Sequence, residues 1–168
     1  MNNNKFQQTE IGEIPEDWSV RLLGDHCKVK GGKRLPKGDN LTINKTNHPY
    51  LRVTDFKEFG IDKSVIQYIE DKTFQEIKRY TIYEGDVYLS IVGTISLVGI
   101  IDSELSGANL TENAAKLFDF QNIDKRFLAY YLKSNIGQEE IHSRTVGSTQ
   151  AKLALHRIEG IRFPAHIL

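Results

Sequence analysis

Cysteine is almost absent from this sequence, since Cys27 is the only one among its 168 residues. A single cysteine excludes an intramolecular disulfide framework and leaves no thiolate cluster for zinc. The five histidines do not predict a metal site either, because none of them are paired in a spacing such as His-x-x-x-His. A chain of this length can bury about 70% of its unfolded surface, so we expect a hydrophobic core to stabilise it without disulfides or metals.

Long apolar runs are also missing. The longest nearly apolar stretch, 89–101, has 13 residues and contains Ser90, Thr94 and Ser96, which makes it too short to cross a bilayer. Residues 1–10 are polar, so no signal peptide is predicted. We therefore expect a cytoplasmic protein without a membrane partner, with a polar N-terminal tail over residues 1–10 and a single domain over residues 11–168.

A net charge is lacking too, because 22 basic residues balance 22 acidic ones. The two signs are nevertheless unevenly distributed: residues 26–63 carry nine basic and four acidic residues, whereas residues 64–124 carry four and ten. Five cations fall within ten residues without an intervening acid, namely Lys28, Lys30, Lys33, Arg34 and Lys37. Such segregation favours a polyanion on one face of the protein, and it is equally compatible with a solvated loop.

The sequence contains no familiar catalytic motif. There is no Gly-x-Ser-x-Gly elbow, and GGKRLPKG (31–38) lacks the Gly-Lys-Ser/Thr ending of a phosphate-binding loop. No Gly-x-Gly follows a predicted strand, so neither a dinucleotide nor adenosylmethionine is indicated. Asp102, Glu104 and Lys116 do not have the spacing of a nuclease motif. We therefore predict no catalytic residue, no metal and no cofactor.

Apolar periodicity predicts an α+β fold, mostly antiparallel or mixed β, with helices concentrated in the C-terminal third. A helix that begins after Asp124 is predicted most clearly, since Phe127, Leu128, Tyr131 and Leu132 recur at helical spacing. Gly137 is expected to interrupt it, and Asp71 is expected to cap a short helix over 73–79. A last small helix is predicted over 152–158, ending at Gly160. The predicted strands are 18–22, 50–56, 65–69, 87–92, 97–101, 114–120 and 161–163.

Four polar segments suit binding. The 28–37 loop offers cations for phosphates, and Arg52, on one strand face with Thr54, has the side chain best shaped to grip guanine. An ion pair of Arg52 with Asp55 or Glu58 is an equally good interpretation. Hydroxyls flank a Gly turn at 90–94, and residues 147–152 precede a helix whose free N–H groups favour a phosphate, although local backbone contacts explain both. The candidate DNA-binding residues are Lys30, Lys33, Arg34, Lys37, Arg52, Thr54, Ser90, Thr94, Ser148, Thr149, Gln150 and Lys152.

The order of seven segments resembles the target-recognition domain of type I restriction-modification specificity subunits. This resemblance implies a non-catalytic domain that reads one half of a split double-stranded DNA target. It also implies a methyltransferase subunit as partner and, through it, a restriction subunit. The segments are IGEIPEDWSVRLLGD (11–25), GGKRLPKG (31–38), HPYLRVTDF (48–56), YEGDVYLSIVGTISLVGII (83–101), LTENAAKLF (110–118), FLAYYLKS (127–134) and GSTQAKLALHRIEGIRFP (147–164).

The sequence departs from the family pattern in two ways. It has one such domain where the family has two joined by helical spacers, so a second specificity half is a possible partner. We also expect this sequence to be without the spacer helix that follows the Phe163-Pro164 position in the family and docks the methyltransferase. Two alternatives stay open: a protein-binding module or decoy that occupies a methyltransferase, and a small DNA-acting enzyme fragment.

Overall fold

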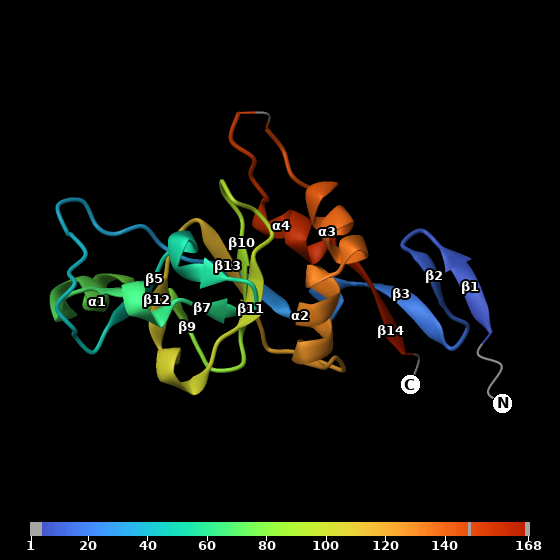
Figure 1. Ribbon diagram of the computed structural model, residues 1–168, viewed down its shortest axis with the longest axis horizontal. Helices are drawn as coiled ribbons and strands as arrows, with labels where there is room; N and C mark the ends of the chain where they lie inside the picture. The colour runs from blue at the N-terminus through green and yellow to red at the C-terminus, as the bar shows by residue number, and fades with distance from the viewer. Residues whose placement is uncertain (1–4, 148, 167–168) are drawn as a thin grey trace.

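The computed structural model describes residues 5–147 and 149–166. A central four-stranded sheet is covered by helices on one face and by a second sheet on the other (Figure 1). The β1–β2 hairpin and β14 lie at one end of the molecule, and α1 lies at the other. The predicted α+β class is confirmed.

The central sheet is antiparallel throughout, in the order β11 (Val98–Ile100), β10 (Val87–Ser90), β13 (Ala114–Phe118), β4 (Lys28–Gly31). In its register Ser90 lies opposite Ala114, and Gly31 lies opposite Ala115. The C-terminal ends of β4 and β10 and the N-terminal end of β13 therefore lie side by side at one end of the sheet. We call the segments that emerge there, 32–37, 91–97 and 111–113, the loop edge.

The second sheet is mixed, in the order β8 (Gln67–Tyr68), β5 (Pro49–Leu51), β12 (Ala108–Leu110), β9 (Thr81–Ile82), with β5 and β12 parallel. Side chains alternate across β10, so Tyr88 faces this second sheet while Leu89 faces the helices. A small third cluster packs α1 (Asp71–Ile77) against Tyr50 and Ile69.

The helical layer consists of α2 (Lys125–Lys133), α3 (Asn135–His142) and α4 (Leu155–Glu159). The predicted cap is confirmed, because the Asp124 carboxylate accepts hydrogen bonds from the backbone amides of Arg126 and Phe127. The predicted break is displaced: Ser134 ends α2 and caps α3, and Gly137 lies inside α3. α4 begins three residues later than predicted and is followed by Gly160.

Short pairs complete the fold. β3 (Trp18–Leu22) pairs with β14 (Arg162–His166), β1 (Phe6–Thr9) with β2 (Gly12–Pro15), and β6 (Phe56–Lys57) with β7 (Gly60–Ile61). Single 3-10 turns cover Leu23–Asp25, Val53–Asp55, Lys63–Val65 and Ser103–Leu105. Within the described residues, no helix has the length and apolar character that crossing a bilayer requires.

Four further expectations about secondary structure were wrong. The segment predicted as a polar N-terminal tail contains β1, whose polar residues are ordered by backbone pairing with β2. The strand expected over 50–56 stops at Leu51, because the Asp55 carboxylate accepts the Arg52 backbone amide and turns the chain. The cation-rich 28–37 segment begins as strand β4 rather than as a loop. The helix expected to be capped by Asp71 starts at that residue, and Glu70 takes the cap position without a side-chain bond.

Candidate nucleic-acid interface

Lys30 and Lys33 converge on one aromatic ring beside the central sheet. Lys30 lies on β4, and its Nζ donates to the Arg79 carbonyl at 2.8 Å. The Nζ atoms of Lys30 and Lys33 lie 5.3 and 5.7 Å from the centroid of the Tyr80 ring. The negative face of the ring accommodates two like charges side by side. No local sequence pattern predicts this contribution from Tyr80, because Tyr80 is distant in the chain from both lysines.

Hydrogen bonds to the main chain fix the loop after β4, and the cations of this loop face outward. The Lys33 amide donates to the Leu110 carbonyl at 2.8 Å, and the Lys33 carbonyl accepts the Tyr50 hydroxyl at 2.8 Å. Only glycine fits at position 32, because a Cβ there would lie 2.0 Å from the Thr111 carbonyl oxygen. The side chains of Lys33, Arg34 and Lys37 are exposed.

Arg34 is held across the loop edge by Glu112, with Nε 2.8 Å from Oε1. Partial burial opposes ionisation of Glu112, but the hydrogen bond from Arg34 and a further one from Thr111 hold the pKa of this carboxyl below its ordinary value. The guanidinium is itself 80% exposed. It is therefore oriented without being covered.

The segment predicted to precede a helix, 147–152, does precede α4, and backbone pairing at its ends closes it into a hairpin. Val146 and Lys152 exchange two backbone hydrogen bonds of 2.9 Å, and α4 begins only at Leu155. Thr149, Gln150 and Lys152 are exposed. The predicted contact residue Ser148 lies outside the described residues.

The β10–β11 turn lies against this hairpin. The Gly93 amide donates to the Ala151 carbonyl at 3.3 Å, and the Leu153 amide donates to the Ile91 carbonyl at 2.9 Å. Thr94 is exposed in the turn. The turn and the loop that joins α3 to α4 project on the same side of the molecule (Figure 1).

Ser90 does not belong to this surface. Its side chain is fully buried, and its Oγ accepts the Leu97 backbone amide at 2.9 Å. The prediction of a DNA contact at Ser90 was therefore wrong, and the hydroxyl closes the turn instead.

Arg52 and Thr54 do not share a strand face, because Arg52 precedes a 3-10 turn and Thr54 lies within it. The Arg52 guanidinium donates to the buried Asp55 carboxylate at 2.7 Å, to Gln67 at 3.0 Å and to the Val65 carbonyl at 3.0 Å. The ion-pair interpretation of Arg52 is confirmed. Thr54 is exposed.

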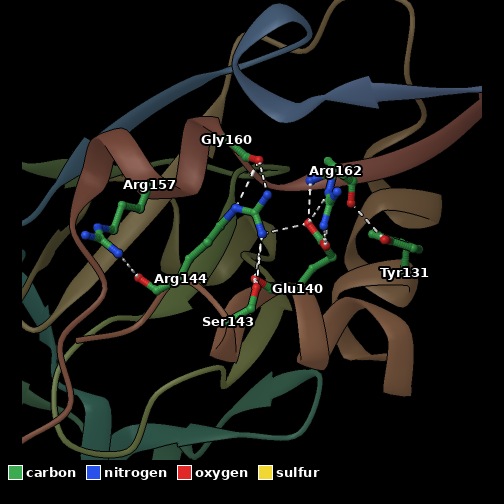
Figure 2. A network of polar contacts seen from close by, with 7 residues as sticks. All are labelled: Tyr131, Glu140, Ser143, Arg144, Arg157, Gly160 and Arg162. Carbon is green, nitrogen blue, oxygen red and sulfur yellow. Dashed lines mark hydrogen bonds and ion pairs between the residues drawn. The ribbon is translucent and has the colours of Figure 1, made fainter. Parts of the chain in front are cut away.

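A polar network that no local sequence pattern predicts lies at the base of the α3–α4 loop (Figure 2). Glu140 on α3 contacts the guanidinium groups of Arg144 at 2.8 Å and Arg162 at 2.7 Å, and it accepts the Arg162 backbone amide at 2.9 Å. Arg144 donates to the Gly160 carbonyl at 2.6 Å, and Arg157 donates to the Arg144 carbonyl at 3.3 Å. Burial opposes ionisation of Glu140, but the hydrogen bonds from Arg162 and the charge of Arg144 hold the pKa of this carboxyl below its ordinary value. The network therefore fixes both ends of the α3–α4 loop.

Among residues 5–147 and 149–166 no three His, Cys, Asp or Glu side chains are grouped as a metal site would need. The loop edge, together with the adjoining α3–α4 loop, instead combines outward cations from 32–37 with exposed hydroxyl and amide side chains from the β10–β11 turn and the α3–α4 loop. Cations that contact phosphates and polar tips that read bases are the two components of a DNA-recognition surface. Both kinds of side chain are present on this side of the fold.

The chain belongs to the family described as type I restriction modification DNA specificity domain, whose family model matches residues 15–165. This confirms the resemblance predicted from the seven segments. Two relatives from Methanocaldococcus jannaschii are a putative type I restriction enzyme MjaX specificity subunit, 27% identical over 88% of this chain, and the MjaVIII specificity subunit, 23% identical over 96%. The chain spans 37% and 39% of their lengths.

Solved structures share the fold. A chain from a study of complex assembly in a type I R-M system has a TM-score of 0.70 at 16% identity, covering 97% of this chain and 37% of that one. The HsdS subunit from Thermoanaerobacter tengcongensis has a TM-score of 0.66 at 15% identity, covering 96% and 36%.

Proposed function

We propose that this chain recognises a specific sequence in double-stranded DNA as one target-recognition domain of a type I restriction-modification system. The observation that carries the proposal is the loop edge with the α3–α4 loop beside it, where cations and polar side chains from distant parts of the sequence meet on one side of the fold. Membership of a DNA specificity domain family supports it.

The surface cations, of which Lys30 is half-buried, serve as phosphate contacts, and the exposed polar side chains serve as base readers. The DNA backbone is contacted by the cations, because phosphate contacts position a protein without reading sequence. These cations are Lys30, Lys33, Arg34, Lys37 and Lys152. The base readers are drawn from the exposed hydroxyl and amide side chains, namely Thr54, Thr94, Thr149 and Gln150, together with Ser148. Arg52 stays a weaker candidate, since its guanidinium already has intramolecular partners.

The domain acts without chemistry of its own and directs partner subunits. We assign it a methyltransferase subunit and, through that subunit, a restriction subunit, since its relatives are named as specificity subunits of restriction enzymes. A second specificity half would complete a two-part target.

A groove of about 380 Å³ supports a protein partner. Trp18, Tyr130 and Ile136 line it, and Tyr130 is 65% exposed. None of the loop-edge segments contribute to the groove, so a methyltransferase subunit bound there would leave the DNA surface free.

Repeated selection from a randomised duplex pool tests the proposal. We expect enrichment of one short motif by this chain, and no cleavage or methylation when magnesium, ATP or adenosylmethionine is added. A pool that stays random after selection, with the protein folded, would reject DNA recognition. Capture of a methyltransferase without any DNA binding would support the decoy alternative, and magnesium-dependent cleavage would support the enzyme alternative.

A further inference from the structure

The two polar loops on the proposed DNA surface, the β10–β11 turn and the α3–α4 loop, form one unit. The β10–β11 turn and the α3–α4 loop are joined by backbone hydrogen bonds from Gly93 to Ala151 and from Leu153 to Ile91, at 3.3 and 2.9 Å. Thr94 on one tip and Thr149 and Gln150 on the other are therefore presented at a fixed spacing. Reading adjacent bases requires such fixed spacing, because base-edge hydrogen bonds tolerate little displacement.

The β10–β11 turn adopts a conformation that it does not favour by itself. Ser96 has a φ of 75°, in the left-handed region that is strained for a residue other than glycine. Such a conformation persists only where neighbouring groups hold it. The Ser96 amide donates to the Ser90 carbonyl at 3.1 Å, and the Ser96 carbonyl accepts Nε2 of Gln138 at 3.2 Å.

Gln138 connects this turn to the helical layer. Its Nε2 also donates to the Leu132 carbonyl near the end of α2, at 2.7 Å. A carboxamide nitrogen has two hydrogens, and both find a carbonyl here. One side chain on α3 thus ties the β10–β11 turn to the end of α2.

Glu140, two residues further along α3, holds the second tip. It contacts Arg144 at the start of the α3–α4 loop, and Arg144 in turn donates to the Gly160 carbonyl just after α4 (Figure 2). Residues two apart on a helix do not face the same way, so Gln138 and Glu140 reach two different elements from one short helix. Neither side chain is among the exposed residues.

We infer that α3 is the positioning element of the recognition surface, with Gln138 and Glu140 as positioning residues that set base specificity without touching DNA. This inference rests on the proposed function. A positioning role differs from a merely structural role in what its loss changes. Loss of the contacts of Gln138 or Glu140 changes which sequences are preferred and leaves the phosphate contacts of 32–37 intact.

The test compares Gln138→Ala with Glu139→Ala, a matched control because Glu139 is exposed on the same helix. The two probes are the duplex that the unaltered chain selects from a randomised pool, and the unselected pool. For Gln138→Ala we expect the ratio of affinities for these probes to fall about tenfold, the effect of losing one base-pair readout. Affinity for the unselected pool and its salt dependence should be unchanged, and Glu139→Ala should match the unaltered chain in both.

A new selection with each variant supplies a second readout. Gln138→Ala should enrich a shifted or degenerate motif, and Arg144→Lys should do the same because lysine cannot reproduce the contacts of guanidinium to Glu140 and Gly160. Gln138→Met keeps the side-chain length and serves if the alanine variant does not fold. Folded variants that enrich the original motif with an undiminished ratio would overturn the inference while leaving the proposed function standing. Failure of the unaltered chain to enrich any motif would instead overturn the proposed function, and this inference with it.

Discussion

At the scale of single residues, the basic side chains divide into two groups with different partners. Arg52, Arg144 and Arg162 are turned inward to the carboxylates of Asp55 and Glu140, both of which are buried. The cations of the 32–37 segment face solvent. A buried carboxylate requires a partner that satisfies several lone pairs at once, which a planar guanidinium does well. The zero net charge of the sequence conceals this division.

The solvent-facing cations of 32–37 should determine how strongly DNA affinity depends on salt. Replacing Lys33, Arg34 and Lys37 together with Ala should weaken binding to all duplexes alike. Each lost phosphate contact should reduce the slope of log affinity against log salt by about 0.9. Titrations at several salt concentrations measure this slope. Arg126→Ala is the control, because that exposed arginine lies on α2 and not at the loop edge. An unchanged slope for the triple variant would remove the 32–37 segment from the interface.

The inward group leads to a prediction about stability. Arg52→Ala leaves the fully buried Asp55 carboxylate without its guanidinium, although the backbone amide of residue 52 still donates to it. We expect the free energy of unfolding to fall by about 2 kcal/mol, as for a buried acceptor that loses a partner. Urea denaturation measures it, with Lys37→Ala as the exposed control. Undiminished stability combined with lost discrimination between target and random duplex would instead make Arg52 a base reader.

At the scale of elements, the sequence predicted best where local signals and tertiary packing agree. The cap at Asp124 and the apolar spacing after it predict α2, and the structure places Leu128, Tyr131 and Leu132 in the core. The Lys-Val-Lys pattern of β4 suggests a loop with clustered cations, and for this reason the strand was not predicted. Val29 packs against the helical core while the lysines point elsewhere, and burial of a single side chain gives too weak a signal.

The sequence predicts which segments contribute to the candidate site, but not how these segments are arranged in space. The 28–37, 90–94 and 147–152 segments were each identified from local composition, and the register of the central sheet is what brings them together. Alternation alone could not show that Ser90 is buried, since its partners Leu97 and Ala114 are fixed by strand pairing. Gln138 and Glu140 carry no sequence signal, because their partners lie in other elements.

The junction of α2 and α3 depends on one glycine. A Cβ at Gly137 would lie 2.0 Å from the Tyr131 carbonyl oxygen and 2.7 Å from the Leu132 Cα. Gly137→Ala should therefore force the two helices apart and lower the free energy of unfolding by about 1–3 kcal/mol, as overpacking does. Thermal or urea unfolding measures the loss. Gly60→Ala is the control, because no atom lies within 4 Å of its added Cβ, and equal stability of the two variants would contradict the prediction.

The Glu140 network makes the helical layer sensitive to acid. Because the pKa of Glu140 is lowered in the folded protein, the network stabilises fully above the ordinary pKa of 4.5 and loses this contribution as the pH falls through the folded pKa. Glu140→Gln cannot titrate, so the difference in unfolding free energy between the unaltered chain and this variant should be constant at neutral pH and shrink below about pH 4.5. Urea denaturation at a series of pH values measures it. A difference independent of pH would show that Glu140 has no lowered pKa.

At the scale of the whole molecule, the proposed recognition surface exists only in the folded chain. Its parts come from residues near 33, 94, 112 and 150, which the two sheets and the helical layer bring to one side. DNA that binds the folded chain but not the unfolded one must raise the apparent stability. The apolar groove lined by Trp18, Tyr130 and Ile136 involves other residues, so binding of DNA and of a protein partner are spatially compatible.

The chain spans 37% of the length of one relative and 39% of another, and one domain of this size covers only a few base pairs. We therefore predict that the single chain is monomeric and binds random duplex near the range of charge-driven contacts, a Kd of about 10⁻⁴–10⁻⁶ M at physiological salt. Joining two copies by a flexible linker should raise the apparent affinity by about 10²–10⁴ on a duplex that carries two selected sites, because the second contact becomes intramolecular. A duplex with one site is the control, since it gains little from the second copy. Anisotropy titrations on the two duplexes measure the gain. Nanomolar binding by the single chain, or equal affinity of the linked pair for both duplexes, would contradict the view that tight recognition arises from pairing two such domains.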